Sequence, residues 1–255
     1  MARTKKADTG AFELYLTDEG EMSSIVQVSD PLHISILNEL SKTPLSMSEV
    51  ADMTGKAQST LSVHMDQLVS RGLISFEFDK NDSRRKIFRL KSRKLAYSKE
   101  VTQFSKGDSE TFFGRMMDSK DFHRDTLTRF LTRIEAVGLD VSPLTEGLGR
   151  EFGEYIASKI QVNKVEDVIT WLQDFYERNA IGEVCIYTFM PLTIIIRSTD
   201  SYPCTITAVA AYHHGLFSEL LSRVTGRKYV VTKSEIFGTD NNYHKFVIEP
   251  KEAVI

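Results

Sequence analysis

The stretch "LSMSEVADMTGKAQSTLSVHMDQLVSRGLISFEF", residues 45–78, contains two helix patterns followed by a strand pattern. In the second helix pattern, Leu61, Met65 and Leu68 recur with the 3.6-residue period of an α-helix and so share one side. Ser62 and Val63 fall on the opposite side. We therefore expect a helix that packs a core with one side and leaves the other side for a partner.

Start and stop signals for helices surround this stretch. Ser46 and Glu49 have the spacing of a capping box, and Gly55 is a residue type that ends helices. Upstream, Pro31 predicts the first position of another helix, capped by Ser29 or Asp30. Downstream, residues 73–78 and 85–90 alternate as strands around the turn "DKNDSR". The order helix, helix, helix, hairpin predicts a winged helix-turn-helix.

A basic segment accompanies the predicted hairpin, although the net charge of the chain is −3. Between residues 80 and 99 the only acid is Asp82. The cations of the segment are Lys80, Arg84, Arg85, Lys86, Arg89, Lys91, Arg93, Lys94 and Lys99. A basic stripe confined to one segment is typical of a nucleic-acid contact, and a solvated pair of charged strands is the alternative.

A recognition helix enters the major groove of DNA by its N-terminal half, and wing cations contact backbone phosphates or the minor groove. The predicted DNA-contacting residues are Lys56, Gln58, Ser59, Thr60, Ser62, Val63, Arg84, Arg85 and Lys86. Among them, Gln58 suits an adenine edge and Val63 a thymine methyl group. Because one chain offers one recognition helix, we expect a homodimer on a double-stranded DNA operator. A winged helix that docks only proteins is the alternative.

Residues 30 to about 92 resemble the ArsR-type winged-helix repressors. The shared features are the Asp-Pro pair at 30–31, the Leu-Ser start at 45–46, "QSTLS" at 58–62 and "GLI" at 72–74. The resemblance implies a DNA-binding regulator. The cysteine-based metal motif of that family would fall in "MSEVADM", residues 47–53, which holds no cysteine. We therefore expect no metal site of the Cys/His kind in the winged helix.

The rest of the chain alternates between helix and strand patterns. Helices are expected near 122–138, 142–160, 165–179 and 203–226, with strands at 183–198, 228–237 and 244–250. The fold class expected for the whole chain is α+β, a winged helix-turn-helix plus an α+β sensor domain with an antiparallel sheet and several helices. The expected domains are an extension with a short strand (1–28), the winged helix (29–97), a connector (98–111) and the sensor (112–250).

The second part resembles the 4-vinyl-reductase-type ligand-binding domain in "VGLDVSPL…GLGREFG", "IGEVCIY", "AAYHHGLFSELLSRVTGRKY" and "KSEIF…HKFVIE". The resemblance implies a sensor and dimerisation domain for a small apolar molecule or a redox state. That family often carries cysteines near its end, whereas here Glu235 leads to Gly238 without a cysteine and His244-Lys245-Phe246 replaces a Cys-x-Phe pattern. A cysteine-based metal or redox site is therefore not carried over from the family.

Several residues of the second part are candidates for sensing. Cys185 and Cys204 are expected to be small buried hydrophobes, with a redox pair as the alternative. His213, His214 and His244 are expected to be helix-surface and capping residues, and ligation of haem or a metal by one of them is the alternative. Tyr212 belongs to an apolar set that could line a pocket or form the core. The other members of this set are Phe189, Met190, Ile194, Ile196, Phe217, Phe237 and Phe246.

Composition and motifs narrow the function classes. No apolar run approaches the roughly 20 residues of a membrane span, no signal peptide is indicated, and two cysteines suit a reducing cytosol. No phosphate loop or catalytic triad pattern is found. We expect a cytoplasmic regulator controlled by a small-molecule effector, with no membrane partner. The alternatives are an enzyme for a tetrapyrrole-like or other apolar substrate, and an interaction protein that does not bind DNA.

Overall fold

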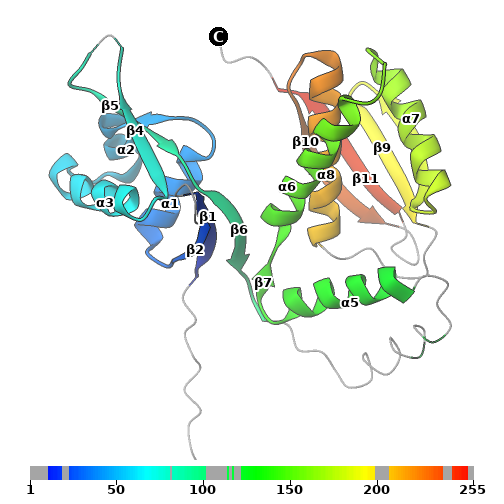
Figure 1. Ribbon diagram of the computed structural model, residues 1–255, viewed down its shortest axis with the longest axis horizontal. Helices are drawn as coiled ribbons and strands as arrows, with labels where there is room; N and C mark the ends of the chain where they lie inside the picture. Colours follow the sequence, from blue (N-terminus) through cyan, green and yellow to red (C-terminus); the bar gives the residue numbers. More distant parts are fainter. Residues whose placement is uncertain are drawn as a thin grey trace, which may run out of the picture. The chain divides into compact units, whose positions relative to one another are not determined.

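The computed structural model describes residues 11–18, 23–80, 82–101, 114, 117, 122–198, 207–237 and 243–251. The chain divides into two compact units, Met1–Glu100 and Val101–Ile255 (Figure 1). Both units combine helices with antiparallel strands, which confirms the α+β class expected from the sequence. No helix of the described ranges is both long and apolar enough to cross a bilayer.

The first unit contains the expected order of helices followed by a hairpin. Its elements are β1 (Glu13–Asp18), β2 (Ser23–Val28), α1 (Pro31–Leu40), β3 (Leu45–Ser46), α2 (Met47–Thr54), α3 (Gln58–Ser70), β4 (Ile74–Phe78), β5 (Lys86–Leu90) and β6 (Arg93–Ser98). Strands β4 and β5 form the antiparallel wing, and β3 adds to β5 in the order β3-β5-β4. The predicted winged helix-turn-helix is therefore present.

The helix boundaries follow from local hydrogen bonds. Asp30, and not Ser29, caps α1, because its Oδ1 accepts the backbone N–H groups of Leu32 at 2.8 Å and His33 at 3.2 Å. Ser46 and Glu49 form the expected capping box of α2. Gly55 ends α2 with φ of +64°, a backbone conformation that favours glycine.

The segment expected to be an extension with one short strand forms two paired strands. Besides pairing with β2, β1 pairs with β6. Tyr15 and Val28 are buried in the same core as the helices of the winged helix-turn-helix. Burial of Glu13 is compensated by Lys94, whose Nζ lies 2.6 Å from Glu13 Oε1. These strands are therefore part of the packed first unit and not an extension outside it.

The second unit is a four-stranded antiparallel sheet with helices. Its elements are α5 (Phe122–Ala136), β7 (Leu139–Asp140), α6 (Ser142–Ala157), α7 (Val165–Arg178), β8 (Gly182–Phe189), β9 (Leu192–Ser198), α8 (Thr207–Thr225), β10 (Tyr229–Phe237) and β11 (Tyr243–Pro250). The strand order is β10-β11-β9-β8. The core joins inward residues of β9 and β11, such as Ile194 and Phe246, to Phe217 of α8 and Leu172 of α7.

Helices α6 and α8 approach each other backbone to backbone. A Cβ atom added to Gly149 of α6 would lie 2.0 Å from the carbonyl oxygen of Tyr212, and one added to Gly215 of α8 would lie 2.0 Å from that of Glu146. Only glycine leaves room for this contact. The small residues in the two helices therefore fix where α8 lies in the second unit.

Candidate nucleic-acid interface

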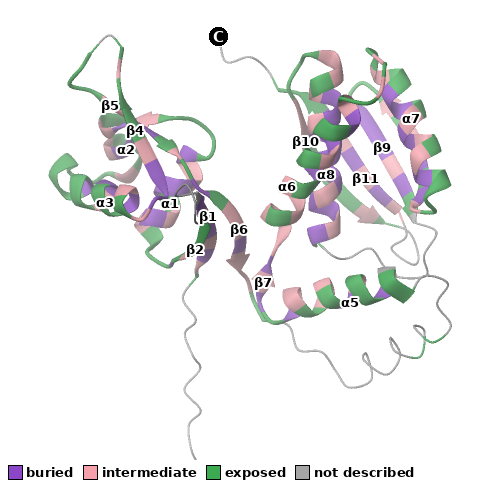
Figure 2. Cartoon of the chain, viewed as in Figure 1, coloured by how far each residue is buried: buried purple, intermediate pink, exposed green. Residues whose placement is uncertain are grey.

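Helix α3 has one buried side and one exposed side, as its sequence predicts. Leu61, Met65 and Leu68 are completely buried, whereas Val63 on the opposite side is 58% exposed. Figure 2 shows both buried and exposed residues along α3. The other expected base-contacting residues are also exposed: Gln58, Ser59, Thr60 and Ser62. An exposed valine surrounded by small polar side chains forms a surface that can meet base edges.

The N-terminus of α3 has no side-chain cap. Ala57 occupies the N-cap position, and no side chain of the described residues caps the helix. Lys56, directly before it, is exposed. Uncapped N–H groups and the positive end of the helix dipole favour an anion at this point.

Arg85, predicted to contact phosphate, is bound within the protein. Its Nη2 donates to Ser46 Oγ at 3.2 Å and lies 3.5 Å from Glu49 Oε2, while Nη1 lies 4.0 Å from Asp79 Oδ2. Hydrogen bonds from Ser46, with a smaller contribution from Arg85, lower the pKa of Glu49. Arg85 therefore joins the wing to the capping box of α2, a role that sequence spacing did not indicate.

The other cations of the basic segment fall into two groups. Some are engaged within the first unit, as shown by Lys86 Nζ at 4.3 Å from the Phe76 ring centroid and Arg89 Nε at 3.7 Å from Glu77 Oε2. Others are exposed, with no side-chain partner in the part of the chain that the structure describes: Lys80, Arg84 and Lys91. Lys80 and Lys91 belong to the basic segment, but they are not among the DNA-contacting residues predicted from the sequence.

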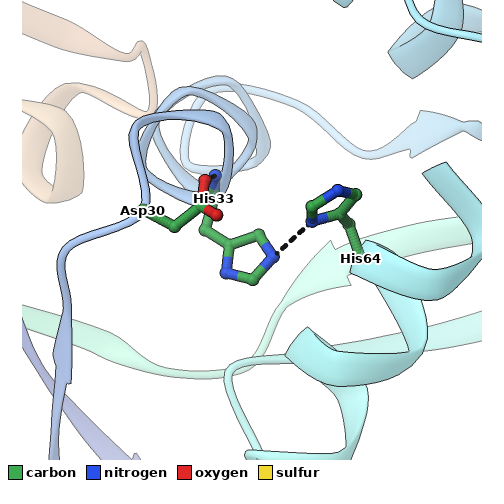
Figure 3. Close-up of side chains that lie close together, drawn as sticks. All are labelled: Asp30, His33 and His64. Carbon is green, nitrogen blue, oxygen red and sulfur yellow. Dashed lines mark hydrogen bonds between the residues drawn. The ribbon is translucent and has the colours of Figure 1, made fainter. Parts of the chain in front are cut away.

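A third feature lies between α1 and α3. His33 Nε2 lies 3.0 Å from His64 Nδ1, and the Asp30 carboxylate is close to both rings (Figure 3). His33 is buried, and this burial lowers its pKa, with smaller contributions in the same direction from His64 and Arg71 and an opposing one from Asp30. The sequence placed His64 beside the apolar side of its helix but did not reveal this pair, because the partner is 31 residues away.

In the second unit, the three candidate histidines gather around Phe246. The ring centroids of His213, His214 and His244 lie 5.7, 5.6 and 4.1 Å from that of Phe246. The expectation that His213 and His214 are helix-surface residues is wrong, because α8 is buried between the sheet and α6 and both rings pack against β11. His213 Nδ1 is 2.7 Å from the Tyr176 hydroxyl.

Burial determines the protonation of this histidine group. It lowers the pKa of His213 to about 3, with smaller contributions from His244 and His214, and the pKa of His244 to about 4, with a smaller contribution from His214. His244 Nδ1 and His214 Nε2 are buried without a hydrogen-bond partner among the described residues. At neutral pH the group therefore consists of uncharged rings with open lone pairs or N–H groups.

Of the two cysteines expected to be buried, only Cys185 lies among the described residues. Cys185 lies on the side of β8 that faces away from the core of the second unit and is exposed. The prediction that it is buried is therefore wrong. The physical reason is strand alternation, which buries Val184 and turns Cys185 outward. Desolvation raises the pKa of the Cys185 thiol, followed by the charge of Glu183. Cys204 lies outside the described residues.

The apolar set from the sequence divides between core and surface. Ile194, Ile196, Phe217 and Phe246 are core residues. The remaining members behave differently: Tyr212 packs at the edge of the core, and Phe189, Met190 and Phe237 are exposed. Of the two possibilities, a pocket lining or the core, the structure supports the core for these four residues.

Helix α5 carries apolar side chains on its exposed side. Leu127 and Phe130 are each 59% exposed and Val137 beyond the helix end is 70% exposed, while Asp125 and Arg129 are only 4% and 9% exposed. Exposed residues at positions 127, 130 and 137, with half-buried Ile134 among them, have the spacing of a helix–helix seam. Apolar residues outside and charged residues inside are typical of a helix that packs against another chain.

Comparisons with known proteins concern the two units separately. Residues 27–85 match the family model of the MarR family. The matched segment contains α1 to α3 and the first wing strand, β4, and it ends directly before β5. This match confirms the winged helix-turn-helix, but it names the MarR family and not the ArsR-type family that the sequence motifs resemble. No curated protein matches the chain. Among solved structures, a vinyl-4-reductase family protein from Methanocaldococcus jannaschii is 11% identical, with a TM-score of 0.33, over 60% of this chain and 100% of that chain.

Proposed function

We propose that the chain is a transcriptional regulator that reads double-stranded DNA with α3 and is controlled through its second unit. The observation that carries the proposal is the division of α3 into a buried side, which fixes the helix, and an exposed side of small polar residues with Val63. The MarR-type match over residues 27–85 supports DNA binding. Assignment to the ArsR-type family rather than the MarR family has only the sequence motifs behind it.

Contacts to DNA are assigned by side-chain chemistry. Gln58 at the start of α3 pairs with a base edge, and Val63 contacts a thymine methyl group. Ser59, Thr60 and Ser62 reach bases or phosphates. Lys56 and the uncapped N–H groups of α3 hold one phosphate, and the exposed cations of the wing hold others.

A homodimer completes the proposal, with α5 as the surface where two copies meet. Leu127, Phe130 and Val137 expose the apolar side that such a contact would bury. Two copies give two recognition helices and an operator with half-sites about 34–36 Å apart. Mass measurement by light scattering is expected to give a dimer for the natural chain and a monomer for Leu127→Glu/Phe130→Glu. A matched exposed change, Leu148→Glu on α6, is expected to leave the dimer intact, and a dimer in all three proteins would contradict this surface.

The second unit is assigned the sensing of a small apolar molecule or a redox state. The buried histidines around Phe246 and the adjacent Tyr212 offer aromatic faces and unpaired ring nitrogens to such an effector. Cys185 and Cys204 are the redox candidates; no cofactor is assigned. For the effector to act, it must bind the DNA-competent and the incompetent dimer with unequal affinity.

The test starts from a pool of random double-stranded DNA, because the operator is unknown. Repeated selection on the purified full chain is expected to enrich a site with two related half-sites, bound at least about 1,000-fold more tightly than bulk DNA. A pool that stays random after selection would reject sequence-specific reading. Binding without turnover of tetrapyrroles by the same protein separates the regulator from the enzyme alternative. Unchanged function in Arg84→Ala/Arg85→Ala would favour an interaction protein that does not bind DNA.

A further inference from the structure

We infer that Asp30, His33 and His64 form a binding site for a divalent transition-metal ion of the zinc class, which joins α1 to the recognition helix α3. The sequence predicts no metal site in the winged helix because its cysteines are missing. This site uses no cysteine. It is assembled from the cap of one helix and one face of another, and it stands whether or not the chain binds DNA.

The distances between the ligand atoms suit a small tetrahedral ion. His33 Nε2 and His64 Nδ1 are 3.0 Å apart, and one ligand atom from each of the three residues lies within 4.8 Å of the others (Figure 3). Two imidazole nitrogens bound to one tetrahedral zinc ion at about 2.0–2.1 Å are about 3.3 Å apart. To bind the ion, the two rings must turn and the Asp30 carboxylate must shift until the three ligand atoms converge at this spacing.

The Nδ1 atom of His33, which is not one of the proposed ligand atoms, can take up the ring proton when the ion binds. His33 is only 5% exposed, and its Nδ1 has no hydrogen-bond partner among the described residues. Without metal, one proton lies between His33 Nε2 and His64 Nδ1. When the ion binds these two nitrogens, His33 carries its proton on Nδ1 instead, and no other hydrogen bond of the described residues is broken. Both rings stay neutral, as metal-bound imidazoles are, and the ion keeps its oxidation state.

Asp30 supplies the negative charge and a fixed third ligand. Its Oδ1 accepts two backbone N–H groups at the start of α1, which orients the carboxylate and leaves Oδ2 for the ion. Two imidazoles and one carboxylate suit Zn²⁺, Co²⁺ or Ni²⁺, whereas Mg²⁺ and Ca²⁺ prefer oxygen ligands. Water would fill the fourth position.

An ion at this site would act on the reading helix. His64 directly follows Ser62 and Val63, which lie on the exposed side of α3, and His33 belongs to the first turn of α1. Metal binding therefore holds the middle of α3 against α1. The consequence for DNA affinity rests on the proposed function, but the binding of the ion does not.

The test uses the full chain without DNA, stripped of metal with a chelator and titrated with Co²⁺. Tetrahedral cobalt has intense visible absorption, and Zn²⁺ is expected to displace it at one ion per chain. Loss of an outer-shell partner weakens metal binding by about 10–100-fold. Because His33 and His64 are direct ligands, His33→Gln and His64→Gln are each expected to weaken cobalt binding by more than this. Asp66→Asn, an exposed acid on the same helix, and His123→Gln, an exposed histidine of α5, are the matched controls and are expected to bind as the natural chain does.

Three results would overturn the site. They are no saturable cobalt binding by the natural chain, unchanged binding in His64→Gln, and loss of binding in His123→Gln alone. Because His64 is only half-buried, its variant remains informative if His33→Gln does not fold, with circular dichroism as the check on folding. Because the assay contains no DNA, its failure leaves the regulator proposal standing, and failure of the DNA selection leaves the metal site standing.

Discussion

The guanidinium group of Arg85 donates a 3.2 Å hydrogen bond to the hydroxyl of Ser46, a residue 39 positions earlier in the chain. Ser46 is also the N-cap of α2 and pairs in β3 with Ile87 of the wing strand β5. The start of α2 and the base of the wing are therefore one hydrogen-bonded structure. A cation that the sequence assigns to DNA thus has a partner inside the protein.

Arg84 and Arg85 are expected to respond differently to alanine substitution. Arg84→Ala should lower the slope of log K against log salt by about 0.9, the value for one phosphate, without changing the melting temperature. Arg85→Ala should also destabilise the first unit, by up to about 1 kcal/mol, because an exposed ion pair is lost. Lys42→Ala, which removes a surface cation just beyond α1 that is paired with Glu39, is the control for both measurements. An unchanged salt slope in Arg84→Ala would remove this residue from the DNA contact.

Gln58→Ala is expected to reduce discrimination between operator and bulk DNA by about 1–3 kcal/mol, the range for one bidentate base contact. Non-specific affinity should stay the same, since no charge is removed. Gln67→Ala provides the matched change in the C-terminal half of the same helix, where it too is exposed. The measurement is competition of the selected site against random DNA. Equal losses on both DNAs would contradict base reading by Gln58.

Gly149→Ala is expected to destabilise the second unit strongly, because the added methyl group would lie 2.0 Å from the carbonyl oxygen of Tyr212. Gly147→Ala, two residues earlier in α6, meets nothing within 4 Å and should stabilise the helix by roughly 0.5–1 kcal/mol. Urea unfolding followed by the fluorescence of Trp171, the single tryptophan, reports on this unit alone. Similar stabilities of the two variants would argue against the close contact of α6 and α8.

The stability of the second unit is expected to fall in acid. The pKa values of His213 and His244 are lowered to about 3 and about 4, so below about pH 6.5 the unfolded chain binds protons that the folded unit excludes. The stabilisation is thus complete above this pH and is lost as the pH falls toward the folded-state pKa values. Each histidine contributes about 1.4 kcal/mol per pH unit in this window.

His244→Phe isolates one of these two contributions. The free energy of unfolding of this variant, measured through Trp171 between pH 7 and 5, should depend on pH less steeply, by about 1 kcal/mol per unit on average over this range. His123→Gln, at an exposed position of α5, is the control and should keep the natural slope. An identical slope in His244→Phe would show that His244 is protonated in the folded unit.

The local sequence predicted the helices of the winged helix-turn-helix well. Caps, breakers and apolar periods act within a few residues, and Ser46, Glu49 and Gly55 do what their types and spacing indicate. The same rules were insufficient for Cys185, because which side of a strand faces the core depends on the sheet it joins. They were also insufficient for His213 and His214, because only the approach of α6 and β11 makes α8 a buried helix.

The sequence by itself determined the α3 surface, since a 3.6-residue period places Leu61, Met65 and Leu68 on one side whatever the rest of the chain does. Only the tertiary structure decided which charged and titratable groups meet. Arg85 reaches Ser46, and His33 reaches His64, across 39 and 31 residues. Contacts at such separations depend on how helices and strands pack, and no local pattern encodes them. The surface proposed to meet DNA could therefore be predicted from the sequence, and the groups that could control it could not.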